Sequence, residues 1–535
     1  MSTTASEEST KKTEEPPGTS LRTELQALRD AIWRRRPILG EIMQKHGNKI
    51  LYSYARDFLD VNPTPGLDHR KQELIDAAHA MTERRLGKEV ADRMACQLRK
   101  YPLVSTTDHH GPIDHPFFVN ANLISAIPYG EKADPDLHSL IVFSFASVSV
   151  NNASAYPRGI LFHGGAGHGG NLSRLPILPD KLKMGVVYAT RAFTREDLTK
   201  AEAELSKKEK AGAIAPGRGE QIRLLMEEFL GRADVLAAPD LDSQITIINY
   251  HLWPRLFHPA VAAQAAPASG PRIPDLLYIE IETLVTDLLL NIHLYDTSTL
   301  MHRSLFDSEF RRLGLEAYNN IPGAFSLEKK WGTFFFWAMD EKLHRVRMML
   351  QDGILQSDDG QITVAWNPEA IAEALRSKKL MPSMLLCYLM VSLYYGMKCL
   401  GGFSQVNDLT KTKEAWISLL RAMGDHAEAE AVQPVQTKEL GGDGMVLPYY
   451  AIAHEEFVPA TGIDMVLQPG ATLFEKYIAR SKLVTLSEMM DPMLPEIYGV
   501  LYAAPERDQR LISLTPEQIL RATGLQRKLV EGFDT

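Results

Sequence analysis

The stretch from Ser139 to Val150, SLIVFSFASVSV, is a nearly unbroken run of β-prone residues. A strand with one face in water alternates apolar and polar side chains, whereas a strand covered on both faces stays apolar throughout. The run therefore predicts a buried strand between two protein layers. It indicates a mixed α/β fold, because the flanking sequence is largely helical in character.

Short strands between glycine- and proline-rich turns are predicted around this run, from residue 101 to about residue 190. These strands are Leu103–Thr106, Phe117–Ile124, Ser139–Val150, Gly159–Phe162 and Gly185–Tyr188. A capping-box pattern that begins at Thr194 predicts a helix over Thr194–Ala211. A second helix at Gly217–Leu230 and a strand at Gln244–Tyr250 are expected to follow.

The two flanks of this region read as mainly helical. Residues 21–100 carry apolar side chains at three- and four-residue spacing. The second half is predicted to contain helices at Leu276–Leu294, Pro368–Arg376, Met381–Leu400 and Leu409–Met423, strands at Thr333–Met339 and Gln361–Trp366, and a last helix after the cap Thr515.

These patterns divide the chain of 535 residues into five parts. Residues 1–20 read as a disordered tail, because they are rich in Ser, Thr, Glu, Lys and Pro. Residues 21–100 form a helical N-terminal region, and residues 101–258 an α/β region with histidine- and glycine-containing loops. Residues 259–270, rich in Ala and Pro, read as a linker or surface loop. Residues 271–535 form a helix-rich α/β region.

Composition limits the setting and the partners. The net charge of −9 argues against a nucleic-acid backbone or an anionic membrane as the main partner. The three cysteines have no CxxC spacing, which favours a reducing compartment. The first 20 residues lack the apolar segment of a signal peptide. We therefore expect a cytoplasmic protein with a small-molecule substrate, and homo-oligomerisation stays open.

The uncharged stretch Met381–Met397, MPSMLLCYLMVSLYYGM, is the one segment apolar enough to suggest a membrane. It is short for a hydrocarbon core of about 30 Å, and it contains Pro382, two serines and three tyrosines. We predict a helix buried in the core, with membrane contact as the alternative.

Five of the sixteen histidines lie in two short elements, Ser105–Pro116 and Leu161–Asn171, each at the end of a predicted strand. Imidazole with carboxylate is the ligand set of zinc, manganese or iron(II). In an extended segment Asp108 and His110 share a face, and the glycines beside His168 let the backbone approach an ion closely.

We therefore predict Asp108, His110 and His168 as metal ligands. His109, His115 and His163 are predicted as catalytic residues, either as further ligands or as proton carriers. The alternative is that both elements are structural turns, with the acidic residues serving as caps.

The two motifs, Asp-His-His-Gly-Pro from Asp108 and Gly-His-Gly-Gly-Asn from Gly167, resemble the paired motifs of the creatininase-type amidohydrolases. The resemblance implies that Asp108, His110 and His168 match metal ligands of that family. It also implies two divalent ions and hydrolysis of amide bonds in small substrates. The chain departs from the family where Ala166 replaces the Asn that opens the second motif, and where Val119 and Asn120 replace the next acidic ligand.

A second group of candidate ligands lies in the sequence YIEIE and the apolar run after it. Glu280, Asp287 and His293 could face inward as ligands. For all of these residues, and for Glu282 beside them, the sequence nevertheless favours capping and surface roles, with Asp287 or His293 as a satisfied buried polar group.

The sequence thus favours a metal-dependent enzyme that hydrolyses a C–N bond of a small polar molecule, with zinc, manganese or iron as cofactor. Two alternatives stay open. The same histidines could serve an iron-dependent oxidative enzyme or a metal-free acid–base enzyme, or the chain could be a non-enzymatic interaction or scaffold protein.

Overall fold

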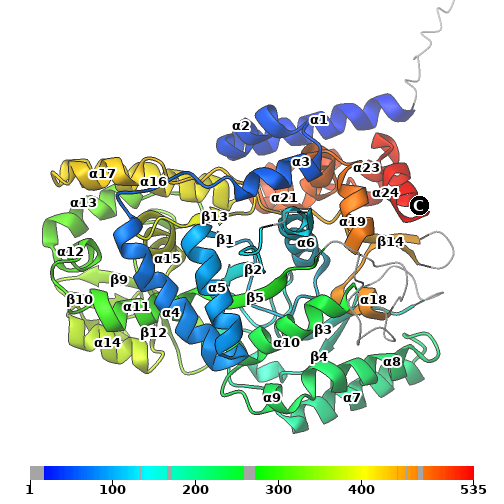
Figure 1. The fold of residues 1–535 in the computed structure, drawn as a ribbon, viewed down its shortest axis with the longest axis horizontal. Coiled ribbons are helices and arrows are strands. Elements are labelled where there is room, and N and C mark those ends of the chain that lie inside the picture. Colours follow the sequence, from blue (N-terminus) through cyan, green and yellow to red (C-terminus); the bar gives the residue numbers. More distant parts are fainter. Residues whose placement is uncertain are drawn as a thin grey trace, which may run out of the picture.

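The computed structural model describes residues 17–131, 134–165, 172–257, 272–442, 444–452, 456–467 and 474–534. The expected linker at 259–270 lies outside these residues, as does most of the expected tail. The last residues of that tail begin helix α1 (Pro17–Arg35). The structure confirms the predicted α/β class, with helical segments at both ends of the chain and a sheet between them (Figure 1).

A parallel four-stranded sheet lies at the centre (Figure 1). Its spatial order is β13 (Lys398–Leu400), β1 (Leu103–Ser105), β2 (Ser139–Ser144) and β5 (Asp275–Glu280). The longest pairing, between β2 and β5, runs from Ser139 opposite Asp275 to Ser144 opposite Glu280. All four strands point the same way, so their carboxyl ends lie along one edge.

Alternating side chains of the sheet enter two separate cores. Ile141, Phe143 and Leu277 pack on one face, with α4 (Asp68–Leu86), α5 (Lys88–Lys100) and α11 (Ile281–Leu288). Leu140, Val142 and Leu276 pack on the other, with α6 (Pro116–Glu131) and α10 (Leu241–Arg255). The strand at the start of the run, β2, is thus covered on both sides as predicted, but it ends at Ser144 and not at Val150.

The chain passes from β1 to β2 and β5 on one side, and then returns to β13 on the other side of β1. This arrangement is that of one half of a doubly wound sheet. The connections that leave β1 and β13 therefore diverge, and a crevice opens between them at the carboxyl edge. Ligands commonly bind at such a point.

The remaining elements surround this sheet. In the sequence, the hairpin of β3 (Gly159–His163) and β4 (Leu172–Pro176) comes after β2 and before β5. The helices α7 (Arg195–Lys210), α8 (Arg218–Leu225) and α9 (Ala233–Leu236) follow the hairpin in the same connection. The connection from β5 to β13 contains the helices α12 (Leu300–Phe306), α13 (Ser308–Tyr318), α14 (Pro368–Arg376) and α15 (Met384–Tyr388). It also contains the short pair of β6 (Phe325–Ser326) and β7 (Trp331–Gly332). A further sheet in this connection has the spatial order β11 (Thr363–Ala365), β10 (Ile354–Ser357), β9 (Arg345–Gln351), β8 (Phe336–Met339) and β12 (Leu380–Pro382).

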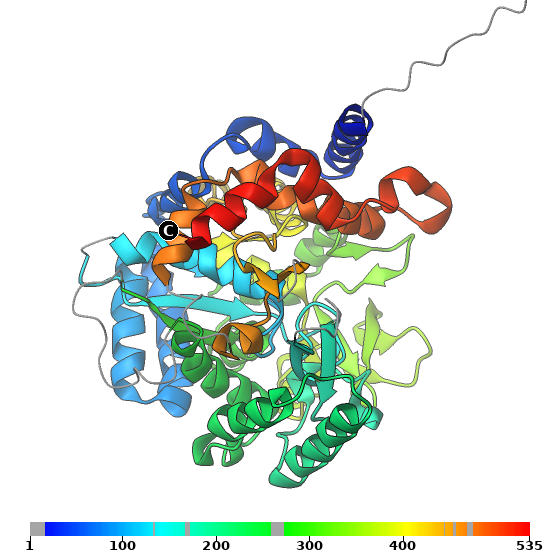
Figure 2. The same ribbon diagram turned by 90° about the vertical axis from the view of Figure 1, so that its right-hand side faces the viewer.

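Helices from the two ends of the chain pack together. The C-terminal helices α21 (Leu494–Leu501), α22 (Gln509–Ile512) and α23 (Pro516–Thr523) contact α1, as both ribbon views show (Figure 2). Other N-terminal helices are α2 (Pro37–His46) and α3 (Leu51–Arg56). The C-terminal part also contains α16 (Gln405–Ala422), α17 (His426–Val432), β14 (Tyr449–Ile452), β15 (Glu456–Pro459), α18 (Gly462–Leu467), α19 (Phe474–Ser481), α20 (Leu486–Met490) and α24 (Leu525–Asp534).

Several predictions of element type are wrong. The expected helix Met381–Leu400 begins in strand β12 and ends in strand β13, and only its middle is helical. Phe117–Ile124 lies in helix α6 and Gln244–Tyr250 lies in helix α10, although both were expected as strands. Conversely, the start of the expected helix Leu276–Leu294 is strand β5, and only the part from Ile281 is helical. In each case the segment is almost wholly buried. It therefore lacks the regularly spaced polar residues that distinguish a helix from a strand in a sequence.

Smaller corrections concern other segments. Gly185–Tyr188 is not a strand, because Val187–Ala189 is a 3-10 turn. The expected strand Thr333–Met339 begins only at Phe336. The capping box at Thr194 and the cap Thr515 are confirmed.

The apolar stretch Met381–Met397 lies in the core. It starts in β12, continues through α15, and passes into a π-helical turn at Leu389–Tyr394 whose side chains are all buried. Among the described residues, no helix has the length and apolar character needed to cross a bilayer.

Glu282 ties the ends of β2 and β5 together. Its two carboxylate oxygens accept hydrogen bonds from the backbone N–H groups of Ala146 (2.9 Å) and Ser147 (3.0 Å). The expectation of a surface role for Glu282 is therefore wrong, since this side chain is fully buried.

We expect Glu282→Ala to lower the free energy of unfolding by about 2–4 kcal/mol, because two buried N–H groups lose their acceptor. Urea denaturation followed by circular dichroism measures this loss. The control Glu373→Ala, at an exposed position of α14, should change the free energy by no more than about 0.5 kcal/mol. Equal stability of the two variants would contradict the assignment.

Candidate functional site

The segment after β1 continues the pairing with β2 beyond the end of the strand. The N–H of Phe145 donates to the carbonyl of Asp108, and the N–H of His110 donates to the carbonyl of Phe145. The segment is thus extended, and neighbouring side chains point to opposite faces. His109 and His110, adjacent in sequence, therefore enter different parts of the molecule.

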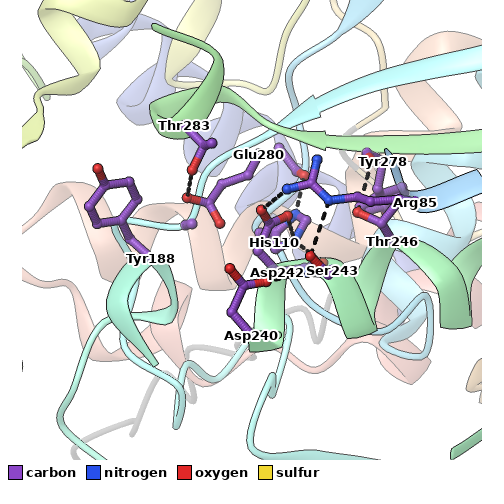
Figure 3. Close-up of polar contacts among 12 residues, drawn as sticks. Arg85, His110, Tyr188, Asp240, Asp242, Ser243, Thr246, Tyr278, Glu280 and Thr283 are labelled. Carbon is purple, nitrogen blue, oxygen red and sulfur yellow. Dashed lines mark hydrogen bonds and ion pairs between the residues drawn. The ribbon is translucent and has the colours of Figure 1, made fainter. Parts of the chain in front are cut away.

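His110 lies in a buried group with Asp242 and Glu280 (Figure 3). Asp242 is at the start of α10, and Glu280 is the last residue of β5. One possible ligand atom from each residue lies within 4.8 Å of the other two. Among the described residues, this is the group whose ligand atoms lie close enough together to hold a metal ion. It lies on the face of the sheet that α10 covers.

The imidazole of His110 is fixed at both nitrogens. Its Nδ1 lies 2.7 Å from the hydroxyl oxygen of Ser144, the residue opposite Glu280 in the strand pairing. Its Nε2 lies 3.1 Å from Oδ1 of Asp242 and 3.3 Å from the backbone oxygen of the same residue. A hydrogen bond at one nitrogen that orients the other toward carboxylates is typical of a histidine ligand.

The two carboxylates are only partly satisfied. Asp242 accepts a hydrogen bond from the guanidinium of Arg85 through Oδ2, and Glu280 accepts one from the hydroxyl of Thr283 (2.8 Å). Oε2 of Glu280 is buried without a hydrogen-bond partner among the described residues, whereas Oδ1 of Asp242 has the His110 imidazole nitrogen 3.1 Å away. Buried oxygens in this state destabilise the fold unless another group satisfies them.

The charges of the group oppose one another. Burial raises the pKa of Glu280 well above its usual range, and the nearby charge of Asp242 raises it further. Burial also acts to raise the pKa of Asp242, but Arg85 and the hydrogen bond from His110 outweigh it and lower that pKa. The geometry thus favours one ionised and one protonated carboxyl group, unless a cation lies between them.

A cavity of ≈ 540 Å³ reaches this group from the surface. Asp242 and Thr283 belong to its wall, which therefore meets the ligand group directly. The wall also carries three cationic side chains and three further carboxylates: Arg84, Arg85, Lys378, Asp234, Asp240 and Asp287. A cavity with both signs of charge suits a small polar molecule.

The structure does not bring Asp108 into the same group. Its carboxylate accepts hydrogen bonds from Thr107 (2.6 Å), Asn122 (2.6 Å) and the hydroxyl of Tyr278. Burial raises the pKa of Asp108 to about 6. Asp108 shares a face with His110 as predicted, but protein donors already occupy both of its oxygens.

His163 is in a separate buried pair. Its Nδ1 lies 2.6 Å from Oδ2 of Asp464, whose Oδ1 accepts a hydrogen bond from Arg218 (2.6 Å). Burial tends to raise the pKa of Asp464, but these two partners lower it. His168, the remaining predicted ligand, lies outside the described residues.

His109 and His115 line a second cavity on the other side of the loop. Burial lowers the pKa of His109, whose Nδ1 contacts Asn152 (3.1 Å). Burial lowers the pKa of His115 to about 4, and the charge of Arg174 adds to the effect. Both imidazoles are therefore neutral near pH 7.

Of the second group of candidates, Glu280 is a member of the cluster, and its expected surface role is wrong. Asp287 lines the cavity of ≈ 540 Å³. His293 contacts the hydroxyl of Tyr395 (2.8 Å) in another part of the core. Sequence reasoning missed Asp242, because it precedes a segment interpreted as a strand. The helix start at Asp240, which caps α10, was the available signal.

Comparison of the chain with models of known protein families and with curated proteins finds no match. The geometry of the site therefore carries the functional argument.

The pair formed by His163 and Asp464 yields a stability prediction. Asp464→Ala should lower the free energy of unfolding by about 3–5 kcal/mol, because it leaves the guanidinium of Arg218 buried without its carboxylate. Thermal and urea unfolding measure the change. As a control, Asp180→Ala removes the largely exposed partner of Arg158 and should cost at most about 1 kcal/mol. A small effect at Asp464 would reopen a catalytic role for His163.

Proposed function

We propose that this protein is a metal-dependent enzyme that acts on a small polar molecule at the carboxyl edge of its parallel sheet. His110, Asp242 and Glu280 would hold the ion. The observation that carries the proposal is the convergence of three buried ligand atoms, one from each residue, within 4.8 Å of one another. The sequence-based set of Asp108, His110 and His168 thus keeps His110 and takes its carboxylates from α10 and β5.

A divalent cation fits the unsatisfied atoms of this group. It would give a partner to Oε2 of Glu280, which is buried without a hydrogen bond among the described residues, and a further partner to Oδ1 of Asp242, which the His110 imidazole approaches. It would also remove the repulsion that raises the pKa of Glu280. One imidazole and two carboxylates match zinc, manganese or iron(II) better than a soft thiolate-binding metal.

Hydrolysis of a C–N bond is the reaction that the creatininase-like motif around His110 favours. A bound divalent ion supplies a Lewis acid to polarise a carbonyl group. The chain's own contribution would be to orient the substrate through the charged groups of the cavity wall. Arg84 lies 3.6 Å from Asp287 there, and Lys378 lies 3.9 Å from Asp240. Asp287, whose pKa burial raises, lines the same cavity and is the proposed proton carrier. The predicted carriers His109, His115 and His163 lie elsewhere.

A metal-free acid–base enzyme is the second candidate. The contact between His110 and Asp242 supports it, because a carboxylate beside an imidazole is a common proton-transfer pair. In that case Glu280 would serve as a protonated acid. The free cysteines Cys96, Cys387 and Cys399 accord with the cytoplasmic location that we propose for either enzyme.

Metal analysis tests the proposal directly. We expect the purified protein to bind about one zinc or manganese ion per chain, and His110→Ala, Asp242→Asn and Glu280→Gln each to lose it. Mass spectrometry of the dialysed proteins measures the metal content. Asp108→Asn is the matched control, since it alters an equally buried carboxylate on the same face and should retain the metal.

Retention of metal by the Glu280→Gln variant, together with its loss from Asp108→Asn, would contradict the assignment. A wild-type protein that binds neither zinc, manganese nor iron would favour the metal-free enzyme.

Thermal unfolding provides an independent measurement. A ligand that binds only the folded state stabilises it by about 2.7 kcal/mol at one hundred times its dissociation constant. Added zinc or manganese should therefore raise the melting temperature of the chelator-treated wild type and of Asp108→Asn. It should leave that of Glu280→Gln unchanged. An equal rise in all three proteins would indicate binding at another site.

A further inference from the structure

The second cavity, of ≈ 630 Å³, occupies the crevice where the connections after β1 and β13 diverge. Thr106, Thr107 and His109 after β1 line one side of it, and Gly402 and Ser404 after β13 line the other. Its wall shares no residue with the cavity of ≈ 540 Å³. The two cavities are therefore separate sites, and the proposed metal site does not account for this one.

Aromatic side chains form much of the wall. They come from α6, from the loop after β2, from β7 and β8, and from α15: Phe117, Phe118, Phe145, Trp331, Trp337 and Tyr388. Flat rings that face a cavity from several directions favour an aromatic ligand, because ring pairs gain more than the area they bury. The volume lies within the range of small-molecule sites.

Asp408 is an acidic side chain that lines the same cavity as these aromatic residues. It lies in the first turn of α16, lines the cavity and is 3% exposed. Its Oδ1 is buried without a hydrogen-bond partner among the described residues, and no described cation lies within ion-pair distance of it. Burial raises the pKa of Asp408 to about 7, although the charge of Arg36 acts to lower it.

The surrounding backbone leaves room for this carboxylate. Gly323 has a φ of +80°, and a Cβ atom there would lie 2.2 Å from Oδ2 of Asp408. Gly323 also lines the cavity, so the absence of a side chain keeps the carboxylate in place beside the open space.

The charges of the wall favour a cation over a phosphate. The amino end of α16 would attract an anion, but the carboxylate of Asp408 in its first turn offsets that field. Glu496 of α21 adds a second carboxylate at an exposed position. The histidines of the wall are neutral, and the guanidinium of Arg345 is occupied by the Trp337 ring (4.4 Å) and the Ser147 carbonyl (3.0 Å).

We propose that this cavity binds a planar aromatic molecule carrying a protonated nitrogen group, such as an amine or an amidine. The nitrogen donates to Asp408, and the ring packs among the aromatic side chains. The ligand thereby supplies the hydrogen bond to Asp408 that the protein leaves unmade. A hydrogen bond between a protonated nitrogen and a carboxylate is stronger than one between neutral groups.

Benzamidine, benzamide and benzoate form a probe series with one ring and three charges. Isothermal titration should detect benzamidine, weaker binding of benzamide and no binding of benzoate. Asp408→Asn should weaken the binding of benzamidine by about tenfold or more, because a charge-assisted hydrogen bond is lost. That variant removes a buried charge without an ion-pair partner, so it should fold, and circular dichroism checks this.

Two further variants locate the binding site. Trp331→Leu removes one aromatic wall on the short β6–β7 pair and should also weaken benzamidine, whereas Asp287→Asn, in the other cavity, should not. The proposal is overturned if no probe binds or if benzoate binds as tightly as benzamidine. It is also overturned if Asp408→Asn binds benzamidine as tightly as the wild type does, or if only Asp287→Asn loses benzamidine binding. None of these results depends on the presence of metal.

Discussion

Parallel pairing of four short strands is the constraint on which the chemistry of this protein depends. It brings residues distant in sequence to one edge of the sheet: the loop after β1, the end of β2, the end of β5 and the loop after β13. Ser144 and Glu280 are neighbours only because β2 and β5 pair in this register. Glu282 accepts hydrogen bonds that hold the same two strand ends together. The same side chain therefore stabilises the sheet and keeps the residues of the site in place.

The buried carboxylates separate into two kinds by their hydrogen bonds. Asp108, Glu282 and Asp464 have donors on both oxygens, which offset part of the cost of burial, and their role is structural. Glu280 and Asp408 each keep an oxygen without a donor among the described residues, and Oδ1 of Asp242 has the His110 imidazole beside it. Every one of these three belongs to a cavity wall or to the ligand group beside one. An oxygen without a hydrogen bond marks a site here only where a cavity lies beside it, because Asp425, Glu428 and Glu439 also carry such an oxygen and line neither cavity.

The sequence predicted the fold class because the run that starts at Ser139 could only be a strand covered on both sides. It failed for α6, α10 and β5, where burial on all sides removes the periodic polar positions that distinguish helix from strand. Of the group, His110 could be predicted as a ligand from its motif, whereas Glu280 was only a candidate, because the sequence favoured capping and surface roles for it. Asp242 could not be predicted, because a strand was expected where α10 begins, and the proximity of these residues arises from a long-range pairing that local patterns do not encode.

The histidine-rich loop itself shows why closeness in sequence misleads here. In an extended segment, consecutive side chains point to opposite faces, so His109 and His110 cannot serve the same site. His110 joins the carboxylates on the α10 face, while His109 enters the aromatic cavity beside Asp408. One short segment thus contributes to the ligand group and to the aromatic cavity. A shift of this segment by one residue would exchange the two imidazoles, and its pairing with Phe145 holds it in register.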